Sequence, residues 1–147
     1  MDLFNYQNQN IKNHFQRSTR IDNDLTKDFL DHFIFHSTGK KVINQITSSI
    51  NNSNQCAFTL TGPYGTGKSS FAILLRSLLG SANSTNYKTS SKKLEKHNKH
   101  LYDKLLQVRT KNRVSTKGFV YVPVVGEKRD LVSSFGDALL EHFENTG

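Results

Sequence analysis

Cysteine and long apolar runs are almost absent from this chain of 147 residues. A single cysteine, Cys56, excludes a disulfide framework and a zinc site built from cysteines. No stretch approaches the roughly 18 consecutive apolar residues that a membrane-spanning helix needs. The first residues also lack a basic stretch followed by an apolar one, so we expect no secretory signal. The composition is typical of a soluble, cytoplasmic protein without a membrane partner.

Acidic residues are also scarce, since 12 Asp and Glu face 20 Lys and Arg and leave a net charge of +8. The surplus is confined to residues 88–117, where ten Lys and Arg meet only Glu95 and Asp103. Two interpretations of this segment stay open. It binds nucleic acid non-specifically through phosphate contacts, or it is an inserted helical hairpin with a solvated basic face.

The apolar patterns predict one domain in three parts. Residues 1–23 are polar and should form a loose N-terminal arm. Residues 24–55 show helical spacing and predict a helical prelude. Residues 56–147 then form a partial core, which a basic helical insertion at 81–118 interrupts.

Two short segments of the core are rich in strand-forming residues. Residues 56–61 and 119–125 predict two β-strands, the second at a sheet edge because Pro123 cannot donate to a ladder. A buried helix should begin at about Lys68 and stop at Gly80. These elements predict an α/β fold with parallel strands.

Further helices are expected around this core. Asp24 is a candidate cap for the first prelude helix, and Ser37 or Thr38 for the second. Within the insertion, a polar loop over 81–93 precedes a helix over 94–109 with one apolar seam. Asp130 opens the last helix. The seam consists of Leu94, Leu101, Leu105 and Val108.

One motif carries chemistry, because residues 62–69 (GPYGTGKS) match G-x-x-x-x-G-K-[ST] between a predicted strand and a predicted helix. Its glycines let backbone N–H groups approach phosphates, and these groups form an anion nest at the helix N-terminus. Lys68 should reach the β- and γ-phosphates, and the Ser69 hydroxyl should ligate Mg²⁺. The candidate binding residues are Gly62, Pro63, Tyr64, Gly65, Thr66, Gly67, Lys68, Ser69 and Ser70.

The string GPYGTGKSS resembles the Walker A loop of the P-loop NTPases. With a helical prelude of about 60 residues, it is similar to the AAA+ and STAND ATPases, in which the prelude lines the adenine side. The strings GPYGTGKSSFAILL and VPVVGEKRD also resemble large bacterial ATP-binding proteins of phage-defence or DNA-processing type. The resemblance implies ATP and Mg²⁺ as ligands and Lys68 as a catalytic residue.

The resemblance also implies a later acidic site that the sequence does not clearly supply. In such families an Asp after an apolar strand holds Mg²⁺, and a Glu polarises water. Glu127 follows the second predicted strand only after Gly126, which is more typical of a surface turn.

Two functions therefore stay open. The chain is the N-terminal part of a larger DNA-linked ATPase of defence or maintenance, with further domains or partner subunits. Alternatively, it is a nucleotide-binding switch or assembly module with little hydrolysis of its own. A small-molecule kinase is a third possibility, although neither an acceptor pocket nor a lid can be assigned.

Overall fold

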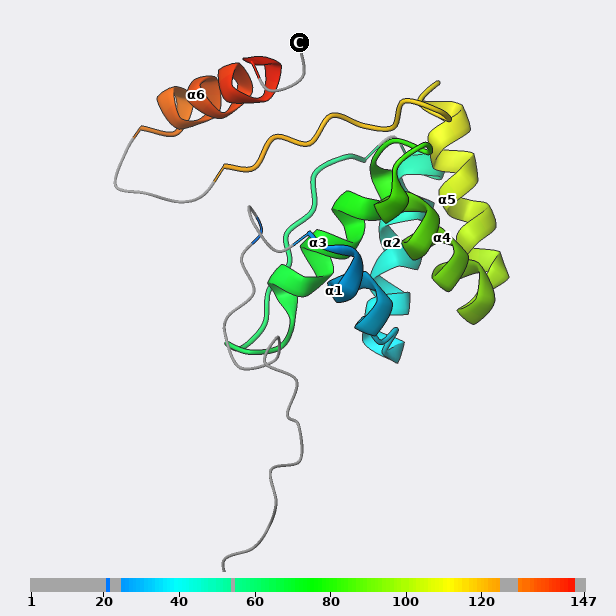
Figure 1. Cartoon of the computed structure of the whole chain (residues 1–147). Coiled ribbons are helices and arrows are strands. Elements are labelled where there is room, and N and C mark those ends of the chain that lie inside the picture. Colours follow the sequence, from blue (N-terminus) through cyan, green and yellow to red (C-terminus); the bar gives the residue numbers. More distant parts are fainter. Residues whose placement is uncertain (1–20, 22–24, 54, 125–129, 145–147) are drawn as a thin grey trace, which may run out of the picture.

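The structure, a computed structural model, describes residues 21, 25–53, 55–124 and 130–144. Apart from residue 21, the expected N-terminal arm lies outside this part of the chain. The described residues form six helices (Figure 1): α1 (Lys27–His32), α2 (Ser37–Ser53), α3 (Lys68–Leu79), α4 (Thr85–His97), α5 (Lys99–Lys111) and α6 (Leu131–Glu144).

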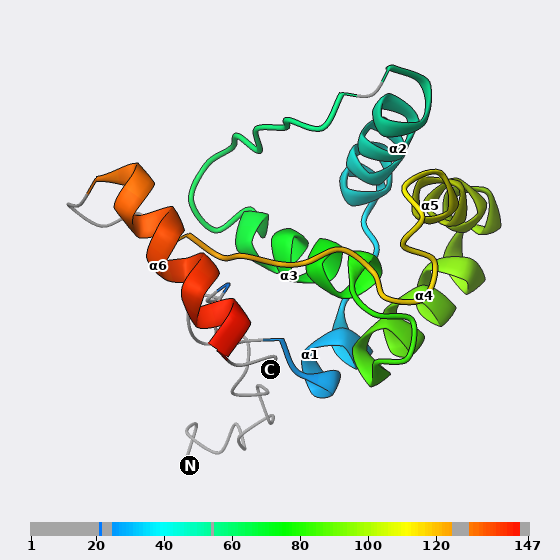
Figure 2. The same ribbon diagram turned by 90° about the horizontal axis from the view of Figure 1, so that it is seen from above.

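The first five helices enclose one apolar core. Helix α2 lies beside α5, and α4 contacts α1, α3 and α5 (Figure 2). Each of these five helices contributes a side chain that is almost fully buried. These side chains are Leu30, Ile43, Leu74, Leu94 and Leu105.

Helix α3 matches the sequence prediction in both bounds and burial. It begins at Lys68, ends before Gly80, and buries Phe71, Ile73 and Leu74 among others. Burial of each such side chain stabilises the fold by about 1.5–3 kcal/mol. The core thereby fixes the N-terminus of α3, where the Gly-rich motif lies.

The two prelude helices begin close to where the sequence places them. The Thr26 hydroxyl accepts a hydrogen bond from the N–H of Phe29, so α1 begins at Lys27, two residues later than a cap at Asp24 would give. Asp24 itself lies outside the described residues. Helix α2 begins at Ser37 itself, so both predicted caps, Ser37 and Thr38, lie within its first turn and not before it.

The predicted loop over 81–93 and the single helix over 94–109 are wrong. Two antiparallel helices, α4 and α5, replace them, and Asn98 separates the two. The Asn98 N–H donates to the carbonyl of Leu94, while its side chain accepts from the N–H of Leu101. The predicted apolar seam is nevertheless buried, because all four of its residues face the core.

The predicted α/β fold with parallel strands is wrong for the residues that the structure describes, because these contain no strand. Both candidate strand segments are extended, but they run apart from each other along α3 (Figures 1 and 2). The N–H of Phe119 donates to the carbonyl of Leu79 at the end of α3, not to a strand neighbour. Val120 remains 64% exposed. Strand-forming residues make no sheet without a paired neighbour, because their propensity depends on cross-strand contacts.

Helix α6 begins directly after Asp130, as predicted. The carboxylate of Asp130 accepts hydrogen bonds from the Ser133 N–H and hydroxyl. None of its described side chains is buried, and the helix lies apart from the other five (Figure 1). Across the described residues, no helix has both the length and the apolar character to cross a membrane.

Candidate functional site

The Gly-rich motif forms a loop that enters α3. Gly62, Gly65 and Gly67 have φ angles of 155°, 78° and 82°. Gly65 and Gly67 thus lie in the left-handed region that costs other residues about 1–2 kcal/mol. This conformation explains why the motif needs glycine at these two positions.

The N-terminus of α3 lacks a side-chain cap, because its N-cap residue is Gly67. The first N–H groups of a helix have no partner within the helix, and the helix dipole is positive at this end. The first bond of α3 joins the Phe71 N–H to the Gly67 carbonyl. The preceding N–H groups therefore supply donors that suit an anion.

The side chains of Lys68 and Thr66 form hydrogen bonds with the backbone of the loop. Lys68 Nζ donates to the carbonyl oxygens of Gly62 and Pro63 at 2.8 and 2.7 Å. The Thr66 hydroxyl donates to the same Pro63 carbonyl at 2.8 Å. The Lys68 ammonium group is therefore held against the backbone of the loop.

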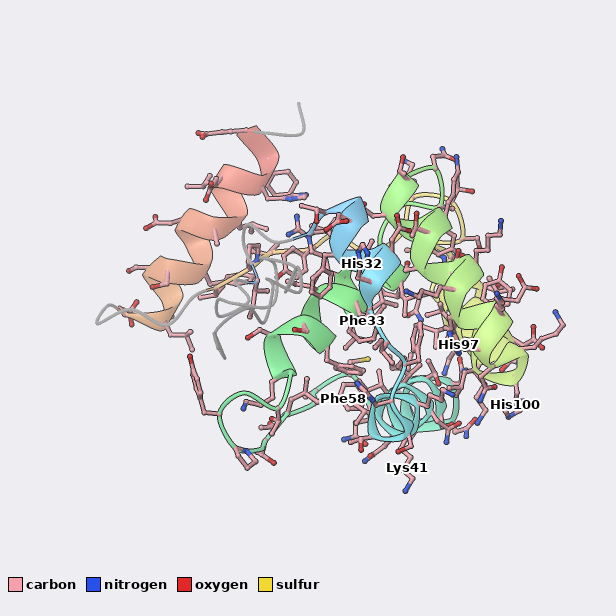
Figure 3. The ribbon with its side chains drawn as sticks, turned by 60° about the horizontal axis from the view of Figure 1, so that its bottom comes forward. His32, Phe33, Lys41, Phe58, His97 and His100 are labelled. Atoms are coloured by element: carbon pink, nitrogen blue, oxygen red, sulfur yellow. The ribbon has the colours of Figure 1, made fainter. Side chains whose placement is uncertain are left out.

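The loop opens onto a cavity of about 630 Å³. The opposite wall comes from the end of α1, the α1–α2 connection and the start of α2. Phe33, Ile34 and Val42 are its main apolar residues there, and His32, His36 and Thr38 are its polar ones. Figure 3 shows His32 and Phe33 on the α1 side. One cavity therefore combines a cationic, donor-rich wall with an apolar wall.

The predicted site residues do not all line this cavity. Gly62, Pro63, Gly65, Thr66, Gly67, Lys68 and Ser70 do. Ser69 is half-buried beside them, whereas Tyr64 is 90% exposed and lies outside the lining. Glu127, the weak candidate for the later acidic site, falls outside the described residues.

The sequence motif did not single out the residues of the opposite wall. Residues 29–42 precede the loop by 20 positions or more and carry no motif of their own. Their only signal was the resemblance, which implies in general that a prelude lines the adenine side. Packing brings them to the loop, since a Cβ on Gly39 would lie 3.9 Å from the Phe71 ring of α3.

Three cations of the basic segment neutralise helix C-termini. The last carbonyls of a helix lack partners, and a cation there also favours the helix dipole. Lys93 donates to the C-terminal end of α1, Lys111 to that of α2, and Arg109 to that of α3. The acceptors are the carbonyls of Leu30 and Asp31 for Lys93, of Ile50 and Asn51 for Lys111, and of Leu78 and Gly80 for Arg109.

Two more cations of the segment have side-chain partners. Lys104 donates to Asn44 and Ser48 of α2, and Lys99 forms ion pairs on its own hairpin. Burial lowers the pKa of Lys93, and the nearby Asp31 carboxylate partly opposes this. Part of the positive charge therefore holds the α4–α5 hairpin on the core.

The two histidines of the basic segment lie on different helices. His97 and His100 have the i, i+3 spacing of a metal pair on a continuous helix, but Asn98 places them on different helices. The His97 ring packs against Phe35, 5.6 Å between centroids. Within the described ranges, no group of three or more His, Cys, Asp or Glu side chains could hold a metal ion.

Comparison with known proteins agrees with the geometry of the loop. The KAP family P-loop domain matches residues 39–139, from the start of α2 into α6. Comparisons with curated proteins and with solved structures gave no match. A P-loop NTPase is thereby shown, whereas the likeness to AAA+ and STAND ATPases stays a prediction. Since the match covers well over half of the sequence, this chain belongs to the KAP family of P-loop domains.

Proposed function

We propose that this domain binds ATP with Mg²⁺. The phosphates lie against the loop over 62–69, and the purine enters the apolar half of the cavity, between α1 and the loop. The family supports nucleotide binding in general. The choice of ATP and the placement of the base are our proposal.

One observation carries this proposal, the presence of two chemically different walls in one cavity. Phosphates need N–H donors and a cation, which the α3 N-terminus and Lys68 supply. A purine needs apolar surface with a few polar groups at its edge, and the α1–α2 wall has both. The volume of about 630 Å³ also falls within the usual range for small-molecule sites.

Lys68 and Ser69 have distinct proposed roles. Lys68 would exchange its carbonyl partners for the β- and γ-phosphate oxygens and compensate their charge. The Ser69 hydroxyl would ligate Mg²⁺, which when bound neutralises phosphate charge. The described residues offer no acidic cluster for this ion, and Mg²⁺ commonly keeps several waters and binds through substrate phosphates.

Calorimetric titration of the full chain with ATP and Mg²⁺ tests the site. Lys68→Ala removes a charge-assisted hydrogen bond worth about 1.5–3 kcal/mol, so we expect about 10- to 150-fold weaker binding. Lys117→Ala is the matched control, since Lys117 is exposed and lies outside the cavity lining. Equal affinity in both variants and the parent would refute the role of Lys68.

A second candidate function is a nucleotide-dependent switch or assembly module with little hydrolysis. Among the described residues, no Asp or Glu lines the cavity, and hydrolysis needs a group that positions the attacking water. We expect phosphate release by the purified chain to stay near background. Robust release that Lys68→Ala abolishes would contradict this candidate, and Glu127→Gln would then show whether Glu127 is the missing acid.

We further propose that the domain works on DNA, as part of a larger ATPase of defence or maintenance. The basic segment over 88–117 supports this role. Two observations test it separately. A natural reading frame that continues beyond residue 147 into an apolar strand ending in Asp-Glu would support the larger ATPase, and binding of a DNA duplex by the present chain would support the DNA role.

A further inference from the structure

The exposed face of α4 carries a stripe of three lysines, Lys88, Lys92 and Lys96. They follow one another at i, i+4 and i+8, so they share one side of the helix over about 12 Å. All three are exposed, whereas the opposite side of α4 buries Tyr87 and Leu94. We refer to these three residues as the lysine stripe.

The stripe lysines differ from most other cations of the segment because their ammonium groups form no hydrogen bond or ion pair with the described residues. Five of the ten cations over 88–117 bind helix ends, α2 side chains or carboxylates, as described above. No hydrogen bond or ion pair joins the three stripe ammonium groups to the described residues. Arg113 and Lys117 also lack such partners, but they lie beyond α5 and are not aligned with the stripe.

We infer that the lysine stripe is a contact surface for the phosphate backbone of duplex DNA. This inference rests on the DNA role proposed above and names its surface. Duplex DNA carries one negative charge per about 1.7 Å of axis, so a 12 Å row of cations faces several phosphates. Hydroxyl side chains, which also bind phosphates, accompany the stripe at Thr85 and Thr89. The Glu95 carboxylate on the same side of α4 is paired with Lys99.

The composition of this face disfavours other partners. An anionic membrane surface binds helices that pair basic residues with exposed apolar ones, and protein interfaces use aromatic anchors. Single-stranded nucleic acid stacks its bases on exposed aromatic rings. The exposed positions of α4 hold no apolar residue and no Phe, Tyr or Trp, because Tyr87 and Leu94 point into the core. The one exposed ring of this helix, that of His97, already packs against Phe35.

The stripe is separate from the nucleotide site. The loop over 62–69 lies at the N-terminal end of α3, whereas α4 and α5 lie toward its C-terminal end (Figure 2). Changes in the stripe should therefore leave ATP binding intact. Variants of the stripe should therefore change DNA binding without changing nucleotide binding.

Fluorescence anisotropy of a labelled DNA duplex with the full chain tests the inference. Three phosphate contacts predict a slope of about −2.7 for log affinity against log salt, or about 40-fold weaker binding at 200 than at 50 mM salt. Lys88→Gln/Lys92→Gln/Lys96→Gln should reduce this slope by about 2.7 and weaken binding at 50 mM about tenfold or more. Circular dichroism and ATP affinity should stay at the parent values.

A second triple variant controls for net charge. Lys41→Gln/Arg113→Gln/Lys117→Gln removes the same three charges from exposed positions elsewhere, and Lys41 points away from the helical body (Figure 3). It should bind DNA as the parent does. Equal losses of DNA affinity in both triple variants, or unchanged affinity in the stripe variant, would refute the stripe as the DNA contact surface. Neither result would refute the DNA role itself. Failure of the parent to bind at 50 mM, or binding to anionic phospholipid vesicles instead, would overturn both.

Discussion

Replacing Arg109 by methionine should destabilise the fold strongly, although this residue belongs to the basic segment and not to the hydrophobic core. Its side chain is only 1% exposed. Nη1 donates to the carbonyls of Leu78 and Gly80 at 3.2 and 2.8 Å, and Nη2 donates to that of Ser115 at 2.9 Å. The guanidinium also lies 4.4 Å from the centroid of the Tyr87 ring.

The magnitude follows from what methionine leaves behind. Of the three bonds, only that to Leu78 is buried, and the other two are part-buried. A carbonyl left buried without a donor costs about 1–3 kcal/mol of stability. The carbonyls of Gly80 and Ser115 cost less, because water can take the place of the lost guanidinium donors there. Loss of the cation–π contact adds about 0.5–2 kcal/mol. We expect a total near 3 kcal/mol, which lowers the melting temperature by about 6–12 °C for a domain of this size.

Urea unfolding followed by circular dichroism measures this cost. Arg113→Met is the matched control, because Arg113 is exposed and its change should stay within about 0.5 kcal/mol. Arg109→Lys should fall between the two, since an ammonium cannot reach three carbonyls as a planar fork does. An Arg109→Met variant as stable as the control would refute the view that the basic segment stabilises the helix ends.

Two further predictions concern single backbone and capping positions. Gly118→Ala should destabilise the fold by about 2 kcal/mol or more in the same unfolding assay, because its φ is +75° and a Cβ would lie 2.2 Å from the Gly80 carbonyl carbon. Gly65→Ala, at a similar φ of +78° but with open space around the Cβ, should cost less, and equal costs would contradict the clash. Hydrogen bonds from Ser133 lower the pKa of Asp130 below its usual value, so its stabilisation of α6 is present above the unfolded pKa and is lost as pH falls through the folded one. Circular dichroism should show that Asp130→Asn removes this acid dependence, and an identical acid transition in both proteins would contradict the assignment.

Sequence reasoning succeeded where the signal was local and strong. The motif over 62–69 and the apolar run after it give the start, end and burial of α3. The seam residues were also identified correctly, because their spacing reflects one helical face even across the break at Asn98. Asn98 itself is a strong N-cap type, and that signal could have located the break.

Helix α4 was missed because its inward face is polar in sequence. Ser90 and Ser91 are buried, yet their hydroxyls donate to carbonyls of their own helix, at Tyr87 and Lys88. Such bonds satisfy a buried hydroxyl without a distant partner. A hydropathy pattern cannot distinguish these serines from those of a polar loop.

The two strands were predicted wrongly because their local sequence signal is strong but a strand also needs a paired neighbour. Phe58 and Val120 have high strand propensity, but among the described residues no segment pairs with theirs to form a sheet. The cavity wall from α1 and α2 was beyond local reasoning, because it depends on packing between segments far apart in sequence. Only the general resemblance to prelude-bearing ATPases pointed toward it.

A single tryptophan in the cavity tests the central claim, that the space between α1 and the loop is the nucleotide site. The chain contains no tryptophan, so Ile34→Trp introduces a probe without background. Ile34 lines the cavity and is 64% exposed, so a larger ring fits there. Leu140→Trp on α6, at a residue 63% exposed and outside the cavity lining, is the matched control. Titration with ATP and Mg²⁺ should change the emission of Ile34→Trp saturably and leave that of Leu140→Trp constant, whereas an unresponsive Ile34→Trp, or equal responses at both positions, would contradict the account.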